Sequence, residues 1–227
     1  MLTERLEVVK KLVENSYITL DVGTDHGYVP ISLINEGRAK KVIAADINKG
    51  PLNNAEKNIR LNGLLDKIEL RLGGGLAPVE EGEADTLIIA GMGGILISEI
   101  FKESKQKALK FKNIILQPMN SQYEIRSYLI LNGFSITKEK LARENDKIYN
   151  ILKVEVKKEE PYVKELYYYA GNPKNFDLND GLTKIYIERK RNQINKIIKN
   201  LSSAKRDVKN ELCYYMKMLE DLEDFYG

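Results

Sequence analysis

Apolar and polar residues alternate in two different patterns along the first 133 residues. Short, nearly continuous apolar runs predict the strands of a buried sheet. These runs lie at residues 17–22, 41–46, 67–71, 85–90 and 113–116. Between them, apolar residues recur every three or four positions and predict helices at 4–14, from Pro30 to Glu36 and from Pro51 to Asn62. Strands that alternate with helices are typical of a parallel sheet covered on both faces.

The pattern changes after Gly133. Residues 134–141 and 147–156 are two β-rich runs separated by a polar segment, Arg143-Glu144-Asn145-Asp146. Two such runs at this distance predict an antiparallel hairpin. The predicted sheet is therefore parallel at first and is closed by an antiparallel pair of strands.

The last part of the chain has the pattern of a long helical segment. Over residues 181–225, apolar residues recur at spacings of three and four, which is typical of a coiled coil. Two helices folded into a hairpin fit this pattern, and a single long helix is the alternative, because no glycine marks a turn. We expect an α/β domain over residues 1–160 and a helical coiled-coil domain over residues 161–227.

The amino-acid composition excludes several classes of site and of protein. Hydrophobic residues make up 43% of the 227 residues, which is enough for a packed core. The chain has one cysteine, Cys213, which excludes an intramolecular disulfide and a cysteine-rich metal site. It has one histidine, His26, which excludes a histidine cluster, so we expect no metal. No apolar run approaches the roughly 20 residues of a membrane span. We therefore expect a cytoplasmic protein, with a monomer favoured.

The most informative segment follows the first predicted strand and reads Asp21-Val22-Gly23-Thr24-Asp25-His26-Gly27. An acid at a strand end, followed by glycines and a helix, is how α/β proteins hold a nucleotide-like cofactor. The D-x-G-x-D-x-G spacing differs from the G-x-G-x-x-G of dinucleotide-binding folds, and its two carboxylates would repel a pyrophosphate. They suit a cationic ligand instead. S-adenosyl-L-methionine is such a ligand, since it carries a sulfonium and an ammonium group.

A second acid supports this interpretation. Asp46 ends the next predicted strand, 25 residues beyond Asp21, about where an acid that binds a ribose is expected. We expect Asp21 to contact the methionine part of the cofactor and Asp46 its ribose. Each acid alone is a weak signal, because an Asp at a strand end is often a helix cap. A parallel sheet closed by an antiparallel hairpin also favours a class I methyltransferase, which has a Rossmann-like sheet.

Three further loops follow predicted strands and belong to the same edge of the sheet. They are Gly73-Gly74-Gly75, Gly91-Met92-Gly93-Gly94 and Gln117-Pro118. Glycines let a ligand approach the backbone closely, and the Gln117 amide offers a donor and an acceptor to a base. A tight turn without any ligand is the alternative for each loop.

The loop sequences resemble a known family. The string Asp21-Val22-Gly23-Thr24-Asp25-His26-Gly27-Tyr28-Val29-Pro30 is similar to the signature of the TrmK family, bacterial tRNA methyltransferases that modify N1 of adenosine 22 in the D-loop region. The resemblance extends to Ala90-Gly91-Met92-Gly93-Gly94, to Gln117-Pro118 and to the helical C-terminal part. It implies methyl transfer from S-adenosyl-L-methionine to tRNA. The chain departs from the family at Gly74, where the family often has Asp.

Together, the loops and the resemblance give the candidate site residues. Cofactor contacts are expected at Asp21, Gly23, His26, Asp46, Ile47, Gly74, Gly75, Gly91, Met92 and Gly93. Substrate contacts are expected at Tyr28, Gln117, Pro118, Lys190 and Arg191.

Catalytic roles are expected at Asp25, His26 and Tyr28. Tyr28 would stack on the target base and His26 would form a hydrogen bond. Asp25 would orient the base or accept a proton from its exocyclic amine. The alternatives are a helix cap for Asp25, a backbone hydrogen bond for His26 and core packing for Tyr28.

Charge is uneven in the C-terminal part. Residues 181–209 carry nine Lys or Arg and two acids, whereas residues 210–227 carry one Lys and five acids. A solvated helix surface is one interpretation, and a contact with a phosphate backbone is the other. The basic residues are Lys184, Arg189, Lys190, Arg191, Lys196, Lys199, Lys205, Arg206 and Lys209. Two other functions stay open, a methyltransferase acting on another RNA or on a small molecule, and a non-catalytic protein that binds S-adenosyl-L-methionine.

Overall fold

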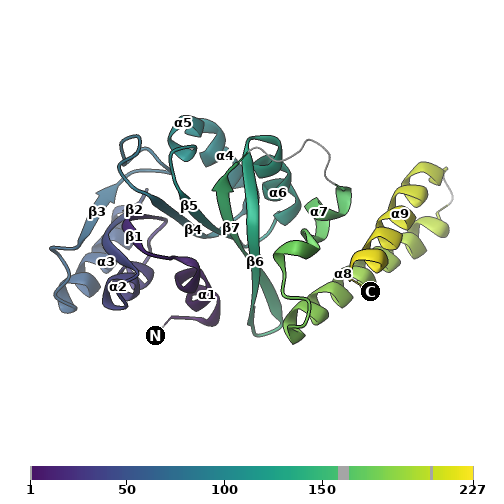
Figure 1. Ribbon diagram of the computed structural model, residues 1–227, viewed down its shortest axis with the longest axis horizontal. Helices are drawn as coiled ribbons and strands as arrows, with labels where there is room; N and C mark the ends of the chain where they lie inside the picture. Colours follow the sequence, from purple (N-terminus) through teal and green to yellow (C-terminus); the bar gives the residue numbers. More distant parts are fainter. Residues whose placement is uncertain (1, 158–163, 205–206, 227) are drawn as a thin grey trace. The chain divides into compact units, whose positions relative to one another are not determined.

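The computed structural model describes residues 2–157, 164–204 and 207–226, which form two units, Met1–Glu159 and Glu160–Gly227. The first unit contains seven strands in one sheet (Figure 1). They are β1 (Ser16–Val22), β2 (Ala39–Asp46), β3 (Ile68–Leu72), β4 (Thr86–Met92), β5 (Asn113–Pro118), β6 (Phe134–Glu144) and β7 (Lys147–Val156). Their order in the sheet is β3-β2-β1-β4-β5-β7-β6. The first five strands are parallel, and β7 is antiparallel to both β5 and β6. The predicted parallel strands and the predicted hairpin are thus confirmed.

Helices cover both faces of this sheet. One set is α1 (Glu4–Leu12), α2 (Tyr28–Asn35) and α3 (Lys49–Leu61), and the other is α4 (Gly94–Glu103), α5 (Lys105–Ala108) and α6 (Gln122–Leu131). Each set shares a hydrophobic core with one face of the sheet. The first unit is therefore a three-layer α/β/α sandwich (Figure 1).

The two cores follow from the alternation of side chains along each buried strand. In β2, Ile43 and Ala45 belong to the core that contains α4 and α6, whereas Val42 and Ala44 belong to the core that contains α1, α2 and α3. Both faces of the strand are buried, which explains why it is a continuous apolar run in the sequence.

The strand order places the loops that matter at one point of the sheet. The chain runs outward through β2 and β3 on one side of β1 and through β4 and β5 on its other side. Ligands of open α/β sheets bind where the strand order reverses, beyond the carboxyl ends of the strands. The ends of β1, β2 and β4 are neighbours there, since Val22 pairs with Ala45 and with Ile89.

The second unit consists of helices. They are α7 (Glu165–Ala170), the 3-10 helix η1 (Pro173–Asn175), α8 (Gly181–Ser202) and α9 (Lys209–Tyr226). Asp180 caps α8, because its carboxylate accepts a hydrogen bond from the backbone of Thr183 at 2.9 Å. The long helices pack against each other, so the predicted pair is confirmed and a single long helix is wrong. The coiled-coil detail stays a prediction.

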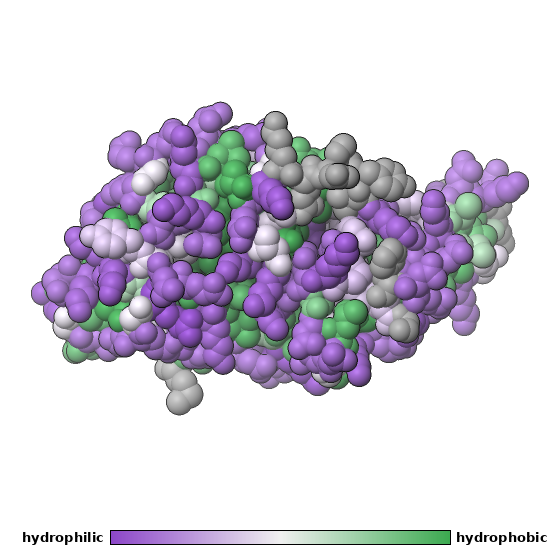
Figure 2. All heavy atoms as spheres, in the orientation of Figure 1, coloured by the Kyte–Doolittle hydropathy of each residue, from purple (hydrophilic) through white to green (hydrophobic). Residues whose placement is uncertain are grey.

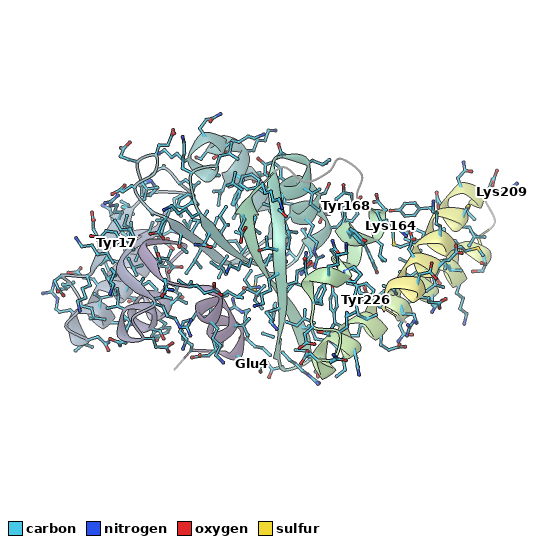
Figure 3. All side chains as sticks on the ribbon, viewed as in Figure 1. Glu4, Tyr17, Lys164, Tyr168, Lys209 and Tyr226 are labelled. Atoms are coloured by element: carbon cyan, nitrogen blue, oxygen red, sulfur yellow. The ribbon has the colours of Figure 1, made fainter. Side chains whose placement is uncertain are left out.

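Polar contacts tie the shorter segments to α9 (Figure 3). The ammonium of Lys164 pairs with Asp221 at 2.6 Å, and the hydroxyl of Tyr226 donates to the carbonyl of Gly171 at 2.7 Å. The sequence pattern did not predict α7. The predicted domain boundary at residues 160–161 and the basic residues Lys205 and Arg206 lie outside the described residues.

The surface of the face in Figure 2 is mainly hydrophilic, with small apolar areas between polar side chains. Within the described residues, no helix has the length and apolar character that crossing a bilayer requires.

A buried ion pair generates a prediction on stability. Arg126 of α6 and Glu139 of β6 pair at 2.7 Å between Nη2 and Oε2, and both side chains are fully buried. Arg126→Met removes the cation paired with the buried carboxylate of Glu139, so we expect it to lower the free energy of unfolding by about 3–5 kcal/mol. Urea denaturation measures this loss.

Arg60→Met is the matched control, because Arg60 forms an exposed pair with Glu56 one helical turn away. Its expected cost is below about 0.5 kcal/mol. Equal losses in the two variants would contradict the importance of burial.

Candidate active site

The loop after β1 is fixed to the neighbouring strand through its backbone. The amides of Gly23 and Thr24 both donate to the carbonyl of Ala45, at 2.8 and 3.0 Å. Gly23 has a φ of +78°, and a Cβ atom there would lie 2.4 Å from the Cε atom of Met92. The left-handed backbone favours glycine at this position, and the terminal methyl group of Met92 fills the space that a side chain would need.

Asp21 carries a charge that the fold alone does not compensate well. Its side chain is buried, with 6% of the residue exposed. The pKa of this carboxyl is raised to about 6, mainly by burial. A hydrogen bond with the side chain of Thr24 lowers it in part, and the nearby Asp46 carboxylate contributes to the rise. A cationic ligand would favour the charged form of Asp21 and relieve this cost. The site therefore fits the sulfonium and ammonium groups of S-adenosyl-L-methionine.

Asp46 anchors the loops that follow β2 and β3. Its carboxylate accepts a hydrogen bond from the amide of Asn48 at 2.7 Å, and its carbonyl accepts one from the amide of Gly73 at 2.9 Å. The adjacent Ile47 is 69% exposed, an unusual state for an isoleucine beside a buried acid. A Cβ atom on Gly74 would lie 3.2 Å from the Cδ1 atom of Ile47. Ile47 and Gly74 thus form one wall of the site. The apolar side chain of Ile47 lies there next to the carboxylate of Asp46.

Asp25, His26 and Tyr28 form an exposed group on the same loop. The rings of His26 and Tyr28 stack with centroids 5.2 Å apart and planes 18° apart. Nε2 of His26 lies 3.4 Å from Oδ2 of Asp25. The backbone carbonyl of His26 accepts a hydrogen bond from Asn58 at 2.9 Å, which fixes the loop to α3.

Two alternatives from the sequence are wrong, namely core packing for Tyr28 and a helix cap for Asp25. Tyr28 is 47% exposed, so it is not a core residue, and it borders a pocket of about 390 Å³ along α2. Gly27, with a φ of +70°, occupies the cap position of α2, and no side chain caps this helix. Asp25 is therefore not the helix cap that its position allowed. His26 makes a backbone contact through its carbonyl and leaves its ring for the stack.

A β-bulge shapes the end of β4. The register with β5 shifts between Ala90 and Met92, so Gly91 has no partner in the ladder and adopts a φ of +85°. The amide of Gly91 donates instead to Oε1 of Gln117 at 3.0 Å. Arg5 of α1 donates to the same oxygen. The sequence did not single out Arg5, because its position in an amphipathic helix looks like that of any surface arginine.

Gln117 and Pro118 lie in the interior of this edge. Both are buried, and the Gln117 amide also donates to the carbonyl of Pro118 at 3.0 Å. Their predicted contact with a base stays a prediction, and the structure gives Gln117 a definite partner in the bulge. Ile95, Leu96 and Met119, in the segments that follow β4 and β5, are exposed large hydrophobic residues. The two remaining predicted cofactor residues are also glycines. Gly75, with a φ of +53°, lies close to Ile100, and Gly93 lies close to Asn120.

In the second unit, Lys190 and Arg191 have partners within the unit. The ammonium of Lys190 lies 4.3 Å from the ring centroid of Tyr169 and 5.6 Å from that of Tyr186. Arg191 pairs with Glu188 one turn earlier. Burial raises the pKa of Tyr169 to about 12, and its hydroxyl donates to Gln193 at 3.0 Å. These two cations are engaged, whereas Lys184, Lys196 and Lys199 on the same helix are exposed.

Comparison with known proteins agrees with this geometry. Residues 2–152 match a family described as a methyltransferase domain. The tRNA (adenine(22)-N(1))-methyltransferase of Bacillus subtilis is 34% identical over 154 residues, which cover 68% of this chain and 65% of that enzyme. The structure of Mycoplasma capricolum TrmK in complex with S-adenosyl-homocysteine has 30% identity and a TM-score of 0.81, and the match covers 100% of this chain and 98% of that one. This chain belongs to the TrmK family.

A structure with bound cofactor extends the comparison. A Streptococcus pneumoniae protein in complex with S-adenosyl-L-methionine is 31% identical to this TrmK-family chain, with a TM-score of 0.82 and full coverage of both chains. The similarity therefore includes both units and not the methyltransferase domain alone.

The buried Asp21 generates a prediction on pH. Because its pKa is raised to about 6, the folded protein binds this proton more tightly than the unfolded chain does between about pH 4 and pH 6. The carboxylate thus destabilises the fold increasingly as the pH rises through this range. We expect ligand-free Asp21→Asn to be more stable than the wild type at neutral pH, by about 1–3 kcal/mol, with a difference that shrinks towards pH 4.

The same substitution should weaken binding of S-adenosyl-L-methionine, measured by calorimetry, because it removes the charge that attracts the cation. Thermal denaturation across the pH range measures the stability. Asp66→Asn, at an exposed position, is the control. A less stable Asp21→Asn protein at neutral pH would refute the electrostatic role.

Proposed function

We propose that this TrmK-family chain methylates N1 of adenosine 22 in the D-loop region of tRNA, with S-adenosyl-L-methionine as the methyl donor. One observation carries the proposal. A single loop joins a buried carboxylate with a raised pKa, Asp21, to an exposed aromatic stack of His26 and Tyr28. The first feature suits a cationic cofactor and the second suits a nucleobase, so the loop brings the two reactants together.

The cofactor would be held by residues at three neighbouring strand ends. Asp21 provides the negative charge, and Asp46 accepts hydrogen bonds from the ribose hydroxyls. Ile47 and Met92 supply apolar surface on either side. When bound, the cofactor supplies an activated methyl group on a positively charged sulfur, which keeps the bonding electron pair as the group leaves.

The target base would be held by the exposed group of the same loop. N1 of adenine lies on the Watson–Crick edge, so the base must leave any pairing before it reacts, and a flipped base is held by stacking and by edge hydrogen bonds. Tyr28 offers its ring for stacking, and His26 supports that ring from the other side. Asp25 lies within reach of the same edge because it is on the same exposed turn.

Asp25 also has a chemical role in this proposal. The lone pair of N1 forms the new bond to carbon, so positive charge develops on the adenine ring and its exocyclic amine. A carboxylate near the amine stabilises this charge and accepts a proton from the amine if the neutral product forms. Methyl transfer of this kind is an in-line displacement, so alignment and exclusion of water supply most of the catalysis. The reaction requires no covalent intermediate and no Lewis acid, so the proposed enzyme contains no metal.

We also propose that the protein acts as a monomer in the cytoplasm.

Capture of the tRNA would involve α8. Its exposed face carries Lys184, Lys196 and Lys199, whereas Lys190 and Arg191 have partners inside the unit. Exposed lysines displace counterions from a phosphate backbone and so bind RNA without regard to sequence. In this proposal the choice of the target base belongs to the loop after β1, and affinity for the tRNA belongs to α8.

The test of the function uses purified protein, S-adenosyl-L-methionine carrying a labelled methyl group, and tRNA transcripts. We expect label at adenosine 22, identified as N1-methyladenosine by mass spectrometry of nuclease fragments. A transcript with guanosine at position 22 is the matched control and should stay unlabelled. Label on ribosomal RNA or on metabolites, with none on tRNA, would favour the other methyltransferase functions. Cofactor binding without any transfer would favour the non-catalytic one.

The exposed loop residues give a prediction that separates binding from chemistry. We expect Tyr28→Ala to raise the KM for tRNA roughly 5- to 150-fold through loss of base stacking, and Tyr28→Phe to restore most of it. Asp25→Asn should lower kcat by about 10²-fold or more, because an amide neither accepts the proton nor balances the charge. Steady-state methylation measures both effects.

Cofactor affinity should stay close to that of the wild type in these variants. Tyr17→Ala is the control, since Tyr17 is an exposed tyrosine at the opposite end of β1 (Figure 3). A parallel loss of cofactor affinity would make Asp25 and Tyr28 part of the loop scaffold instead.

The exposed lysines of α8 give a prediction on salt dependence. Changing Lys184, Lys196 and Lys199 together to Gln should weaken tRNA binding. The slope of log K against log salt should decrease by about 0.7–1 for each lost phosphate contact. Filter binding at several salt concentrations measures this slope. A matched triple variant replaces Lys40, Lys41 and Lys67, three exposed lysines at the amino ends of β2 and β3. Identical slopes for both triple variants would make the charge of α8 a solvated surface only.

A further inference from the structure

The bulge at the end of β4 frees one backbone amide that the ladder would otherwise use. Register passes from Ala90 opposite Gln117 directly to Met92 opposite Pro118. Gly91 is the extra residue, with a φ of +85° that favours glycine. Bulges of this kind are common next to active sites, where they redirect a side chain. Here the residue that follows the bulge is Met92.

Met92 is where the bulge meets the cofactor loop. Its Cε atom would lie 2.4 Å from a Cβ atom on Gly23, so the methionine contacts the first glycine of that loop directly. Its carbonyl accepts a hydrogen bond from the amide of Met119 at 2.8 Å. A shift of the bulge would therefore change the contact of Met92 with the cofactor loop and its hydrogen bond with the loop after β5 at the same time.

A side chain holds the bulge in place of the ladder. The freed amide of Gly91 donates to Oε1 of Gln117 at 3.0 Å, while Nε2 of Gln117 donates to the carbonyl of Pro118 at 3.0 Å. These two bonds fix which end of the amide is oxygen. Gln117 is fully buried, and its bond to the carbonyl of Pro118 is buried with it, whereas the bond to the exposed Gly91 is partly buried.

Arg5 completes the arrangement from outside the sheet. Its Nη1 donates to the same oxygen of Gln117, a charge-assisted hydrogen bond. Arg5 is itself fixed, because its backbone amide donates to Glu144 at 3.1 Å and its guanidinium lies 5.6 Å from the ring centroid of Tyr149. Its Nε lies 3.6 Å from the other carboxylate oxygen of Glu144. The arginine thus joins α1 and the β6–β7 hairpin to the end of β4.

We propose that Arg5 and Gln117 are positioning residues for methyl transfer, which act by holding the Gly91 bulge and through it Met92. This inference rests on the proposed function. Neither residue needs to touch the substrate or the cofactor. They set the distance between the β4 loop and the loop after β1, on which an in-line displacement depends strongly. A misplacement of about 1 Å costs such a reaction on the order of a hundredfold in rate.

The first measurement addresses the bulge itself and needs no activity. Labelling with ¹⁵N-glycine gives a spectrum of at most 16 amides, among them Gly91. We expect its hydrogen exchange to be about tenfold faster in Gln117→Ala, which removes the acceptor. Arg5→Ala should also accelerate exchange, whereas Lys11→Ala, at an exposed position on the same helix, should leave it unchanged. Unchanged exchange at Gly91 in both Arg5→Ala and Gln117→Ala would overturn the proposal.

The second measurement addresses catalysis, with single-turnover methylation of tRNA. We expect the rate constant of Arg5→Ala to fall on the order of 10- to 100-fold, while the Kd for S-adenosyl-L-methionine and for tRNA changes far less. Arg5→Lys keeps the charge and a donor, and should recover part of the rate. Added guanidinium should also restore part of the rate of Arg5→Ala, an effect that a merely structural role would not produce.

The outcomes distinguish this inference from the proposed function. An Arg5→Ala protein as fast as Lys11→Ala overturns the positioning role. So does a rate loss that follows the loss of thermal stability and that neither Arg5→Lys nor guanidinium reverses. A wild type that methylates no tRNA contradicts the proposed function instead. In that case the exchange of the Gly91 amide still decides whether Arg5 and Gln117 hold the bulge.

Discussion

A negative charge buried at the end of β1 is the constraint around which this molecule is arranged. Asp21 sits where two hydrophobic strands flank its own, and a second carboxylate, Asp46, is near enough to raise its pKa further. The fold alone gains nothing from this arrangement, because a charged group in a low-dielectric interior destabilises the folded state. A cation at the same place offsets the cost. A cationic ligand that binds the folded state would therefore also stabilise it.

The parallel sheet makes such an arrangement possible. Regular ladders leave no free backbone groups, so a site at their edge needs local exceptions to regular structure. Among the described residues, the left-handed turn at Gly23 and the bulge at Gly91 are two such exceptions, and they meet at Met92. Both exceptions are stabilised from elsewhere. The carbonyl of Ala45 accepts the amides of the turn, and the side chain of Gln117 accepts the amide of the bulge.

Sequence patterns predicted the parts of this fold that depend on burial. Strands buried on both faces are continuous apolar runs, so β1 to β5 and the β6–β7 hairpin were found within a few residues of their observed bounds. The loops of the site followed from the rule that parallel strands end at one edge. The pattern did not predict α7, whose six residues are too short to show a helical period.

Contacts between distant side chains were beyond the reach of the pattern. Nothing in the sequence distinguishes Arg5 from an ordinary surface arginine, because its partners Gln117 and Glu144 are far along the chain. Lys190 and Arg191 were predicted to contact the substrate, which stays a prediction, and the sequence did not show that each has a partner in its own unit. The helix and strand propensities of a segment, and the period of its apolar residues, indicate how the segment is buried. They do not describe which polar atoms meet once the segments are packed.

The contact between Arg5 and Glu144 also bears on how the protein is made. These residues are 139 positions apart in the chain, and Lys153 of β7 pairs with Glu14 across the same separation. During synthesis, α1 leaves the ribosome long before its partners exist, and contacts of such high sequence separation form late in folding. The strands β1 to β5 pair with nearer neighbours and need not wait. A nascent chain can thus assemble most of its sheet before the edge that would carry out chemistry is locked, so a partly made protein lacks an ordered site.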